Sequence, residues 1–294
     1  GAMGRPMAHH LLRRADTHVG ITGRGAERYR DLVDAGATWH DSPRSLAAGA
    51  RVILLMLPDL PQVEAVLGGP DGILAASPTD LLLVVSSTSS PAGVRALGRR
   101  LEEETKGAVR LVDAPVSGGV EGAAAGTLSI MVGGSDADAA VAASVLAACG
   151  RPVHLGPLGA GQVAKACNQL IVAATVLSLG EALVLAERSG LDLDLLVDLL
   201  AGGYADSRIL RTRGARMVAE DYGPSAAARY LLKDVGFAAD VAADTDTATA
   251  LLPAVRAAFT ELVERGLGDA DIGVTRRLTQ ERGRTPGLGD ADPG

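Results

Sequence analysis

A lysine and an asparagine stand three residues apart in the stretch GAGQVAKACN, at residues 159–168. In a helix, this spacing places Lys165 and Asn168 on the same face. Only three of the 28 basic residues are lysines, and arginine cannot replace lysine in proton transfer because it stays protonated. Burial lowers the pKa of an amine toward neutrality, where it serves best as a general acid or base. Lys165 is therefore a candidate for acid–base chemistry; the alternative is a lysine whose stem lies on apolar surface while its ammonium reaches solvent.

A second polar turn, DAPVSGG at residues 113–119, follows a predicted buried strand. Ser117 offers a hydroxyl group, and Gly118 and Gly119 leave their backbone N–H groups unhindered. Such a turn suits a carboxylate, which makes these three residues candidate ligands for an acidic substrate. A tight turn that uses glycine for positive φ is the alternative; it accounts for the two glycines but not for the whole heptapeptide.

The chain begins with two glycines three residues apart. Gly1, Ala2, Met3 and Gly4 match the back half of the G-x-G-x-x-G turn, in which glycine lets the backbone approach a pyrophosphate at a helix N-terminus. This half-motif predicts a dinucleotide site. The alternative is that the first three residues come from a cloning vector.

Further candidates for the dinucleotide site follow predicted strands. No acid occupies residues 21–25, where an NAD site usually places one to bind the ribose, and Arg24 stands where a 2′-phosphate would be accommodated. Arg24 therefore favours NADP(H), with NAD(H) possible, although a solvated loop arginine is the alternative. Leu57 and Pro58 close one predicted strand and Thr88 follows the next; taken alone, each is an ordinary strand end.

Strands alternate with helices in the first half, which indicates a parallel, doubly wound α/β sheet of the Rossmann type. The predicted strands are 17–22, 52–57, 81–87, 109–113 and 128–132. The predicted helices are 3–14, 24–35, 42–48, 60–67 and 91–104, and another starts at Ser135, followed by two acids. Only helices are predicted after Gly156, beginning with a long apolar one over 161–190 and continuing at 192–200, 233–243, 254–265 and 270–280. We therefore expect a cofactor domain at 1–156, an all-helical domain at 157–281 and a disordered tail at 282–294.

Composition narrows the possible functions. The 294 residues are 47% hydrophobic and carry a net charge of −7, which provides a core but not the basic excess of a nucleic-acid binder. Two cysteines cannot form a disulfide framework, which favours the cytoplasm. The five histidines have neither metal-ligand nor triad spacing, so no metal site is expected. The longest apolar stretch, Leu170–Gly180, is too short for a membrane span.

Together, these segments resemble the β-hydroxyacid dehydrogenase family, which includes 3-hydroxyisobutyrate dehydrogenase and is related to 6-phosphogluconate dehydrogenase. The resemblance runs from Gly1 to about Leu278 and includes the following stretches: GAMGRPMA at 1–8, MLPD at 56–59, ST at 87–88, DAPVSGG at 113–119, GTLSIMVGG at 126–134, the stretch holding Lys165 and Asn168, and KD at 233–234. Val85 departs from the family, which often has aspartate there. The family's first strand and first glycine would precede Gly1, so the Rossmann-like sheet is expected here without that strand.

The resemblance implies roles for individual residues. Lys165 would be the catalytic acid/base, and the substrate would be held by Ser117, Gly118, Gly119 and Asn168. The coenzyme would contact residues 1–4, Arg24, Leu57, Pro58, Thr88 and Lys233. Helix-end electrostatics is the alternative reading of the Lys233–Asp234 pair, which is expected to open its helix.

The implied reaction interconverts a small 3-hydroxy acid, such as 3-hydroxyisobutyrate, and its semialdehyde by hydride transfer. The partner would be a small carboxylate-bearing substrate, in a homodimer or homotetramer. Two alternatives stay open: a short-chain semialdehyde, glyoxylate or tartronate semialdehyde reductase of the same family, and a non-catalytic dinucleotide-binding protein. An imine reductase shares the fold but commonly lacks the lysine, so Lys165 counts against it.

Overall fold

The computed structural model describes residues 1–282, and its chain divides into two compact units, Gly1–Lys165 and Ala166 onward. The division falls inside helix α8, Ala160–Arg188, the longest of the described helices. The domain limits expected at residues 156 and 281 stay a prediction. The tail expected to be disordered lies, apart from Arg282, outside the described residues.

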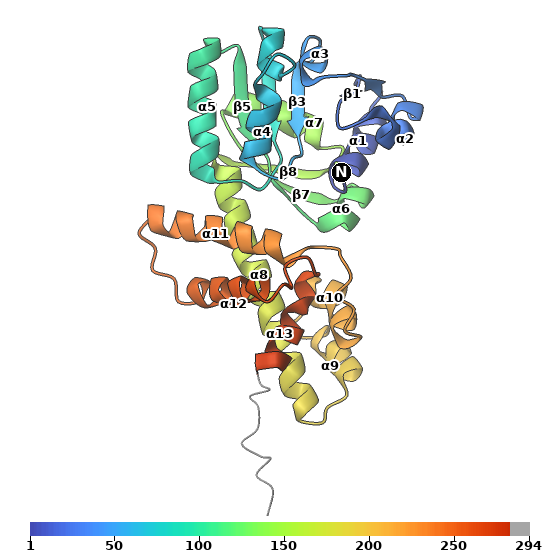
Figure 1. Ribbon diagram of the computed structural model, residues 1–294, viewed down its shortest axis with the longest axis vertical. Coiled ribbons are helices and arrows are strands. Elements are labelled where there is room, and N and C mark those ends of the chain that lie inside the picture. Colours follow the sequence, from blue (N-terminus) through green and yellow to red (C-terminus); the bar gives the residue numbers. More distant parts are fainter. Residues whose placement is uncertain (283–294) are drawn as a thin grey trace, which may run out of the picture. The chain divides into compact units, whose positions relative to one another are not determined.

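The first unit is built on two sheets (Figure 1). A six-stranded sheet has the order β3-β4-β5-β7-β6, and β8 also pairs with β7. A separate two-stranded parallel sheet joins β1 and β2. The strands are β1 Gly20–Ile21, β2 Thr38–Trp39, β3 Val52–Leu55, β4 Leu81–Val85, β5 Val109–Asp113, β6 Val116–Ser117, β7 Leu128–Gly133 and β8 Gly150–Gly156. Strands β3, β4 and β5 run parallel, whereas β7 is antiparallel to β5 and β6 and parallel to β8. The α/β class is confirmed, but the prediction that all strands run parallel is wrong, because β7 follows β6 antiparallel and makes the sheet mixed.

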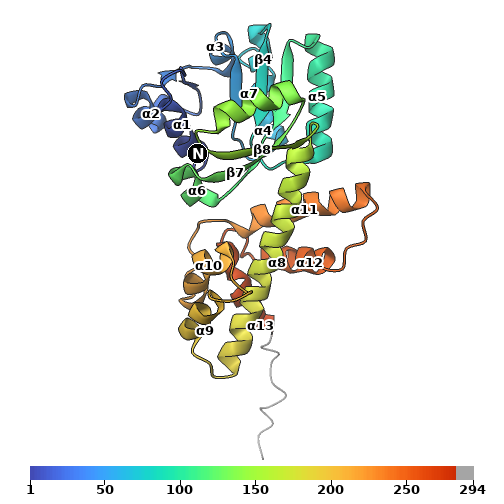
Figure 2. The ribbon, with the colours of Figure 1, turned by 180° about the vertical axis from the view of Figure 1, so that it is seen from behind.

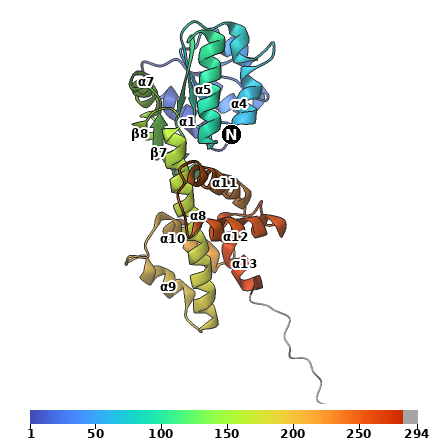
Figure 3. The same ribbon diagram turned by 90° about the vertical axis from the view of Figure 1, so that its left-hand side faces the viewer.

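Helices cover both faces of the larger sheet. The helices of this unit, besides the start of α8, are α1 Gly4–Leu12, α2 Arg30–Asp34, α3 Pro43–Ala47, α4 Leu60–Leu67, α5 Pro91–Thr105, α6 Gly119–Ala125 and α7 Asp136–Leu146. Helices α4 and α5 lie on one side of the strands and α7 on the other (Figure 3), where α7 packs against β5, β7 and β8 (Figure 2). Because both faces are covered, every residue of β4 is buried.

Some predicted elements of this unit are wrong in extent. The strand expected over 17–22 is only Gly20–Ile21, and the helix expected over 24–35 is a 3-10 turn, Ala26–Tyr29, followed by α2. Strand β8 was not predicted, because its residues are mostly exposed and carry no apolar run. Helix α6 was not predicted either; it has only seven residues and begins in the glycine pair.

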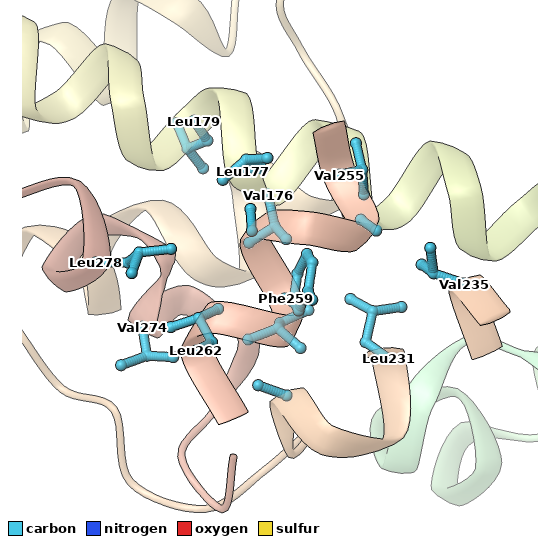
Figure 4. Close-up of a cluster of buried hydrophobic side chains, with 14 of the residues drawn as sticks. Val176, Leu177, Leu179, Leu231, Val235, Val255, Phe259, Leu262, Val274 and Leu278 are labelled. Carbon is cyan, nitrogen blue, oxygen red and sulfur yellow. The ribbon is translucent and has the colours of Figure 1, made fainter. Parts of the chain in front are cut away.

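The second unit is helical, as predicted. Besides α8, it contains α9 Leu193–Leu200, α10 Arg208–Val218, α11 Ala228–Asp244, α12 Leu252–Glu264, a 3-10 turn at Ile272–Val274 and α13 Thr275–Arg282. Phe259 is fully buried at the centre of its core, among Val176 of α8, Leu231 of α11 and Leu262 of α12 (Figure 4). One helix, α10, was not predicted, and α11 begins five residues before Lys233, so the expectation that Lys233–Asp234 opens a helix is wrong.

Among the described helices, α8 alone has the length and hydropathy of a membrane span. The core helix of a folded domain can have the same length and hydropathy. Ala173, Val176 and Leu183 of α8 are fully buried within the protein, whereas Ile171 and Leu185 are exposed. Packing in the helical core therefore accounts for part of its apolar character.

Candidate active site

The dinucleotide candidates at the start of the chain surround the N-terminus of α1. Gly4 is the first residue of α1, and Met3 before it makes no side-chain cap; the first turn also lacks an acid. The leading N–H groups of a helix have no partner within it and attract anions. Arg24 is exposed just after β1. The pKa of the Gly1 amino group is lowered by burial first, then by the charge of Arg5 and then by the charge of Arg24. Gly1 and Arg24 therefore lie near each other, at a helix end suited to phosphate.

The ends of β3 and β4 are joined directly. The backbone N–H of Leu57 donates to Ser87 Oγ at 3.1 Å, which brings together the two segments that resemble family coenzyme contacts, with Pro58 and Thr88 as their next residues. Two buried hydroxyl oxygens here, Ser86 Oγ and Ser89 Oγ, have no hydrogen-bond partner among the described residues. A buried hydroxyl group without a hydrogen-bond partner is energetically costly. The residues present therefore fit a polar ligand such as a dinucleotide at this strand end.

The predicted substrate turn has the geometry that its glycines allow. Ser117 ends β6, opposite Ser129 of β7, and Gly118 and Gly119 have φ of +137° and +67°. Side chains other than glycine rarely adopt these angles, so the conformational reason for the two glycines holds whether or not they bind a ligand. Asp113, which opens the same motif, ends β5 and is fully buried.

Lys165 is 7% exposed and lies in the second turn of α8. The start of α8 is bonded to two strand ends. Asp113 accepts hydrogen bonds from the N–H groups of Gly159 and Gln162, both at 2.7 Å. The Gln162 side chain accepts from the N–H of Ser89 at 2.9 Å and donates to the carbonyl of Ser87 at 2.8 Å. These bonds connect the helix of Lys165 to the strands that precede the substrate turn and the Thr88 segment.

Within the helical unit, Asn168 belongs to a chain of polar contacts. Its Nδ2 donates to Gln169 Oε1 at 2.8 Å, and Gln169 Nε2 donates to Asp234 Oδ2 at 2.7 Å. Asp234 Oδ1 is 3.3 Å from Lys233 Nζ, which also lies 5.0 Å from the centre of the Phe237 ring. The structure thus links the two candidates of this unit, Asn168 and Lys233.

Comparison with known proteins places these residues in a family. The family model described as the NAD binding domain of 6-phosphogluconate dehydrogenase matches residues 1–159. A second, described as NAD-binding of NADP-dependent 3-hydroxyisobutyrate dehydrogenase, matches residues 159–278. The chain belongs to the β-hydroxyacid dehydrogenase family. It is an NAD(P)-dependent oxidoreductase.

Individual members of the β-hydroxyacid dehydrogenase family are similar over most of the chain. The 2-hydroxy-3-oxopropionate reductase of Escherichia coli (strain K12) is 37% identical over 240 residues, which are 81% of this chain and 80% of its own. An NAD-dependent L-serine dehydrogenase of Pseudomonas aeruginosa is 32% identical over 286 residues, 95% of each chain. The structure of Mycobacterium tuberculosis 3-hydroxyisobutyrate dehydrogenase with L-serine has a TM-score of 0.79 and 29% identity, covering 94% of this chain and 95% of its own.

Sequence reasoning assigned no role to Asp113 or Gln162, the two buried polar side chains that hold the start of α8. A carboxylate at the end of the otherwise apolar strand VRLVD was a signal that could have drawn attention to Asp113. The roles of individual family residues in this chain stay predictions. Among residues 1–282, no group of three or more His, Cys, Asp or Glu side chains could hold a metal.

Proposed function

We propose that this protein interconverts a small 3-hydroxy acid, 3-hydroxyisobutyrate or a close analogue, and its semialdehyde, with NADP(H) preferred and NAD(H) accepted. The observation that carries the proposal is the placement of Lys165. It is a buried lysine on a helix whose start is bonded both to the strand before the DAPVSGG turn and to the strand end suited to a dinucleotide. A buried amine there supports proton transfer next to a hydride-transfer site.

The chain's own groups have the following proposed tasks. The coenzyme, when bound, supplies hydride to the substrate carbonyl carbon or accepts it in the reverse direction. The Lys165 ammonium donates a proton to the carbonyl oxygen during reduction, and the Lys165 amine takes the proton back during oxidation. Ser117 and the N–H groups of Gly118 and Gly119 bind the substrate carboxylate. Asn168, three residues after Lys165 on α8, donates or accepts a hydrogen bond with the substrate.

We assign coenzyme binding to residues of the first unit together with Lys233. The N–H groups near Gly1, Ala2, Met3 and Gly4 would hold the pyrophosphate at the start of α1. Leu57, Pro58 and Thr88 would line the strand ends. Arg24 would bind the 2′-phosphate, and the absence of an acid from residues 21–25 supports the NADP preference. A family relative is named as NAD-dependent, so the test compares NADPH with NADH.

A second candidate is a tartronate semialdehyde or glyoxylate reductase. The similarity to a 2-hydroxy-3-oxopropionate reductase favours it, and both candidates use the same residues in the same roles. A non-catalytic dinucleotide-binding role is disfavoured because Lys165 is present. Assembly as a homodimer or homotetramer and a cytoplasmic location remain expectations.

The test is coenzyme oxidation followed at the nicotinamide absorbance. Purified protein is given NADPH or NADH and each of a panel: methylmalonate semialdehyde, succinate semialdehyde, tartronate semialdehyde, glyoxylate, and propanal as a control without a carboxylate. Turnover of one acid-bearing aldehyde, faster with NADPH and absent with propanal, supports the proposal. Turnover of propanal alone contradicts carboxylate recognition, and no turnover with any of them contradicts the proposed substrate class.

A further inference from the structure

The carboxylate of Asp113 holds the N-terminus of α8 with both of its oxygens. Oδ1 accepts from the N–H of Gly159 and Oδ2 from the N–H of Gln162, each at 2.7 Å. These N–H groups belong to the positive end of a 29-residue helix, where a carboxylate is favourable. An ordinary cap comes from the residue just before the helix, whereas this one comes from a strand 46 residues earlier in the chain.

The packing around Asp113 fixes its carboxylate in one position. A Cβ atom on Gly133 would lie 2.4 Å from Asp113 Oδ1, and one on Gly161 would lie 2.8 Å from Oδ2 and 2.2 Å from the carbonyl oxygen of Met131. Only glycine fits at these two positions, one on β7 and one in α8. The carboxylate is enclosed in this way. The helix start therefore cannot shift relative to β5 without breaking a hydrogen bond or causing a steric clash with the carboxylate.

Gln162 gives the same helix turn a second attachment. Its side chain is 1% exposed and bonds the backbone of Ser87 and Ser89, one bond as donor and one as acceptor. An apolar side chain at this position would leave both buried backbone groups without a hydrogen-bond partner. The first turn of α8 is thus fixed to β5 by Asp113 and to the loop after β4 by Gln162.

We propose that Asp113 and Gln162 are positioning residues that set the rotation and the axial place of α8, and so the place of the Lys165 ammonium. This inference rests on the proposed function. Lys165 follows Gln162 by three residues, about one helical turn, and a one-residue slip would turn it by about 100°. The strand that ends in Asp113 continues directly into the turn with Ser117, so one carboxylate sets both the proposed acid/base and the proposed carboxylate site.

Two variants test the inference. Asp113→Asn keeps the side-chain volume but replaces one acceptor oxygen by an NH₂ group that faces a donor. Gln162→Met keeps the length of the side chain but removes both hydrogen bonds, and it tests the same role if Asp113→Asn folds poorly. Asp192→Ala is the matched control, because Asp192 caps α9 through the N–H of Leu195 in the helical unit and has no proposed role in the reaction.

Hydrogen exchange and kinetics are measured on the same samples. In both variants, we expect faster amide exchange in a peptide covering residues 157–166 and unchanged exchange in β4. The kcat per coenzyme-binding site should fall about tenfold to a hundredfold, with little change in coenzyme affinity. The Asp192→Ala control should show faster exchange only around α9 and a kcat equal to that of the wild type.

Each outcome bears on the inference. Unchanged exchange over 157–166 in both variants would overturn it, and so would faster exchange with wild-type kcat per coenzyme site. A loss of activity that only matches a loss of coenzyme-binding sites would indicate a merely structural role and would also overturn it. If the wild type reduces none of the aldehydes, the proposed function fails, and the exchange result still shows whether Asp113 and Gln162 hold α8.

Discussion

Gln169 Nε2 donates a hydrogen bond of 2.7 Å to Asp234 Oδ2 and joins α8 to α11 in the helical unit. The Gln169 side chain also accepts from Asn168 Nδ2. One glutamine therefore holds Asn168 on one side and the Lys233–Asp234 pair on the other. Gln169 thereby supplies a hydrogen-bond acceptor for the Asn168 amide.

Gln169→Met should weaken substrate binding more than turnover. The change removes the acceptor of Asn168 and one donor to Asp234, and a lost hydrogen bond of this kind costs about 1 kcal/mol, or about fivefold in KM. Steady-state kinetics with the best substrate give KM and kcat separately. Gln280→Met is the control, because Gln280 also bonds carboxylates, those of Glu187 and Glu220; an equal rise in KM there would contradict the role of Gln169.

Lys165→Met should abolish turnover while coenzyme binding persists. Removal of a positioned general acid or base lowers the rate by about 10² to 10⁴, and the methionine preserves most of the packing volume. The measurements are kcat and a fluorescence titration with NADPH. Lys106→Met, a change at an exposed lysine after α5, should leave both quantities as in the wild type. Substantial activity in Lys165→Met would disprove the acid/base assignment.

Arg24→Ala should reduce the preference for NADPH. Loss of a guanidinium–phosphate contact costs about 1.5 to 3 kcal/mol, so KM for NADPH should rise about tenfold or more, while KM for NADH stays nearly constant. Arg30→Ala serves as the control, because Arg30 is exposed and pairs only weakly with Glu27 at 3.6 Å. A parallel rise of both KM values would mean that Arg24 does not read the 2′-phosphate.

Asp113 should make stability depend on pH between about 4 and 7. Burial, opposed by the hydrogen bonds from Gly159 and Gln162 and by the charge of Arg95, raises the pKa of Asp113 from 3.8 to about 6. The folded state therefore binds this proton more tightly than the unfolded state, so its stabilisation is full below about pH 4 and is lost as the pH rises through about 6. The full effect is about 3 kcal/mol.

The comparison of wild type with Asp113→Asn isolates this effect from other titrating groups. Urea unfolding at about pH 4.5 and about pH 7.5 gives the free energy of unfolding of each protein. The difference, wild type minus variant, should be smaller at the higher pH. A difference that grows with pH would show that folding lowers the pKa of Asp113.

Gly161→Ala should destabilise the fold. Its Cβ would lie 2.2 Å from the carbonyl oxygen of Met131, a contact that neither backbone segment can relieve, and overpacking of this kind costs about 3 kcal/mol. Gly236→Ala, in the interior of α11 where the new Cβ meets nothing within 4 Å, should stabilise by about 1 kcal/mol. Urea unfolding midpoints, compared at an unchanged m-value, measure both changes in the free energy of unfolding. Two changes of the same sign would refute this account.

Elements with strong local signals were predictable from the sequence. Strand β5 and helix α4 have the predicted bounds, Val109–Asp113 and Leu60–Leu67, because an apolar run marks the strand and an Asp cap with proline in the first turn marks the helix. Helix α10 was not predicted because it is rich in arginine; Arg213 is buried through its ion pair with Asp271, at 3.2 Å, a contact that no local pattern reveals.

The candidate site was predictable only as far as its motifs reach. The sequence singled out Lys165 and the Ser117–Gly119 turn, but not what holds them. Asp113 and Gln162 act through partners 46 and more than 70 residues away, and such distances are set by the order of strands in the sheet. The start of α11 was misplaced because no side chain caps it at Ala227.

The long-range cap on α8 limits how natural or engineered sequences of this family can recombine. The two family models meet at residue 159, which is an obvious crossover point for joining the halves of two relatives. Such a hybrid would take Asp113, Gly133 and Ser87 from one parent and Gly159, Gly161 and Gln162 from the other. Ser87 contributes only its backbone carbonyl, so compatible parents must share the other five residues, and a hybrid library filtered on these five should yield far more folded clones than one filtered on overall identity.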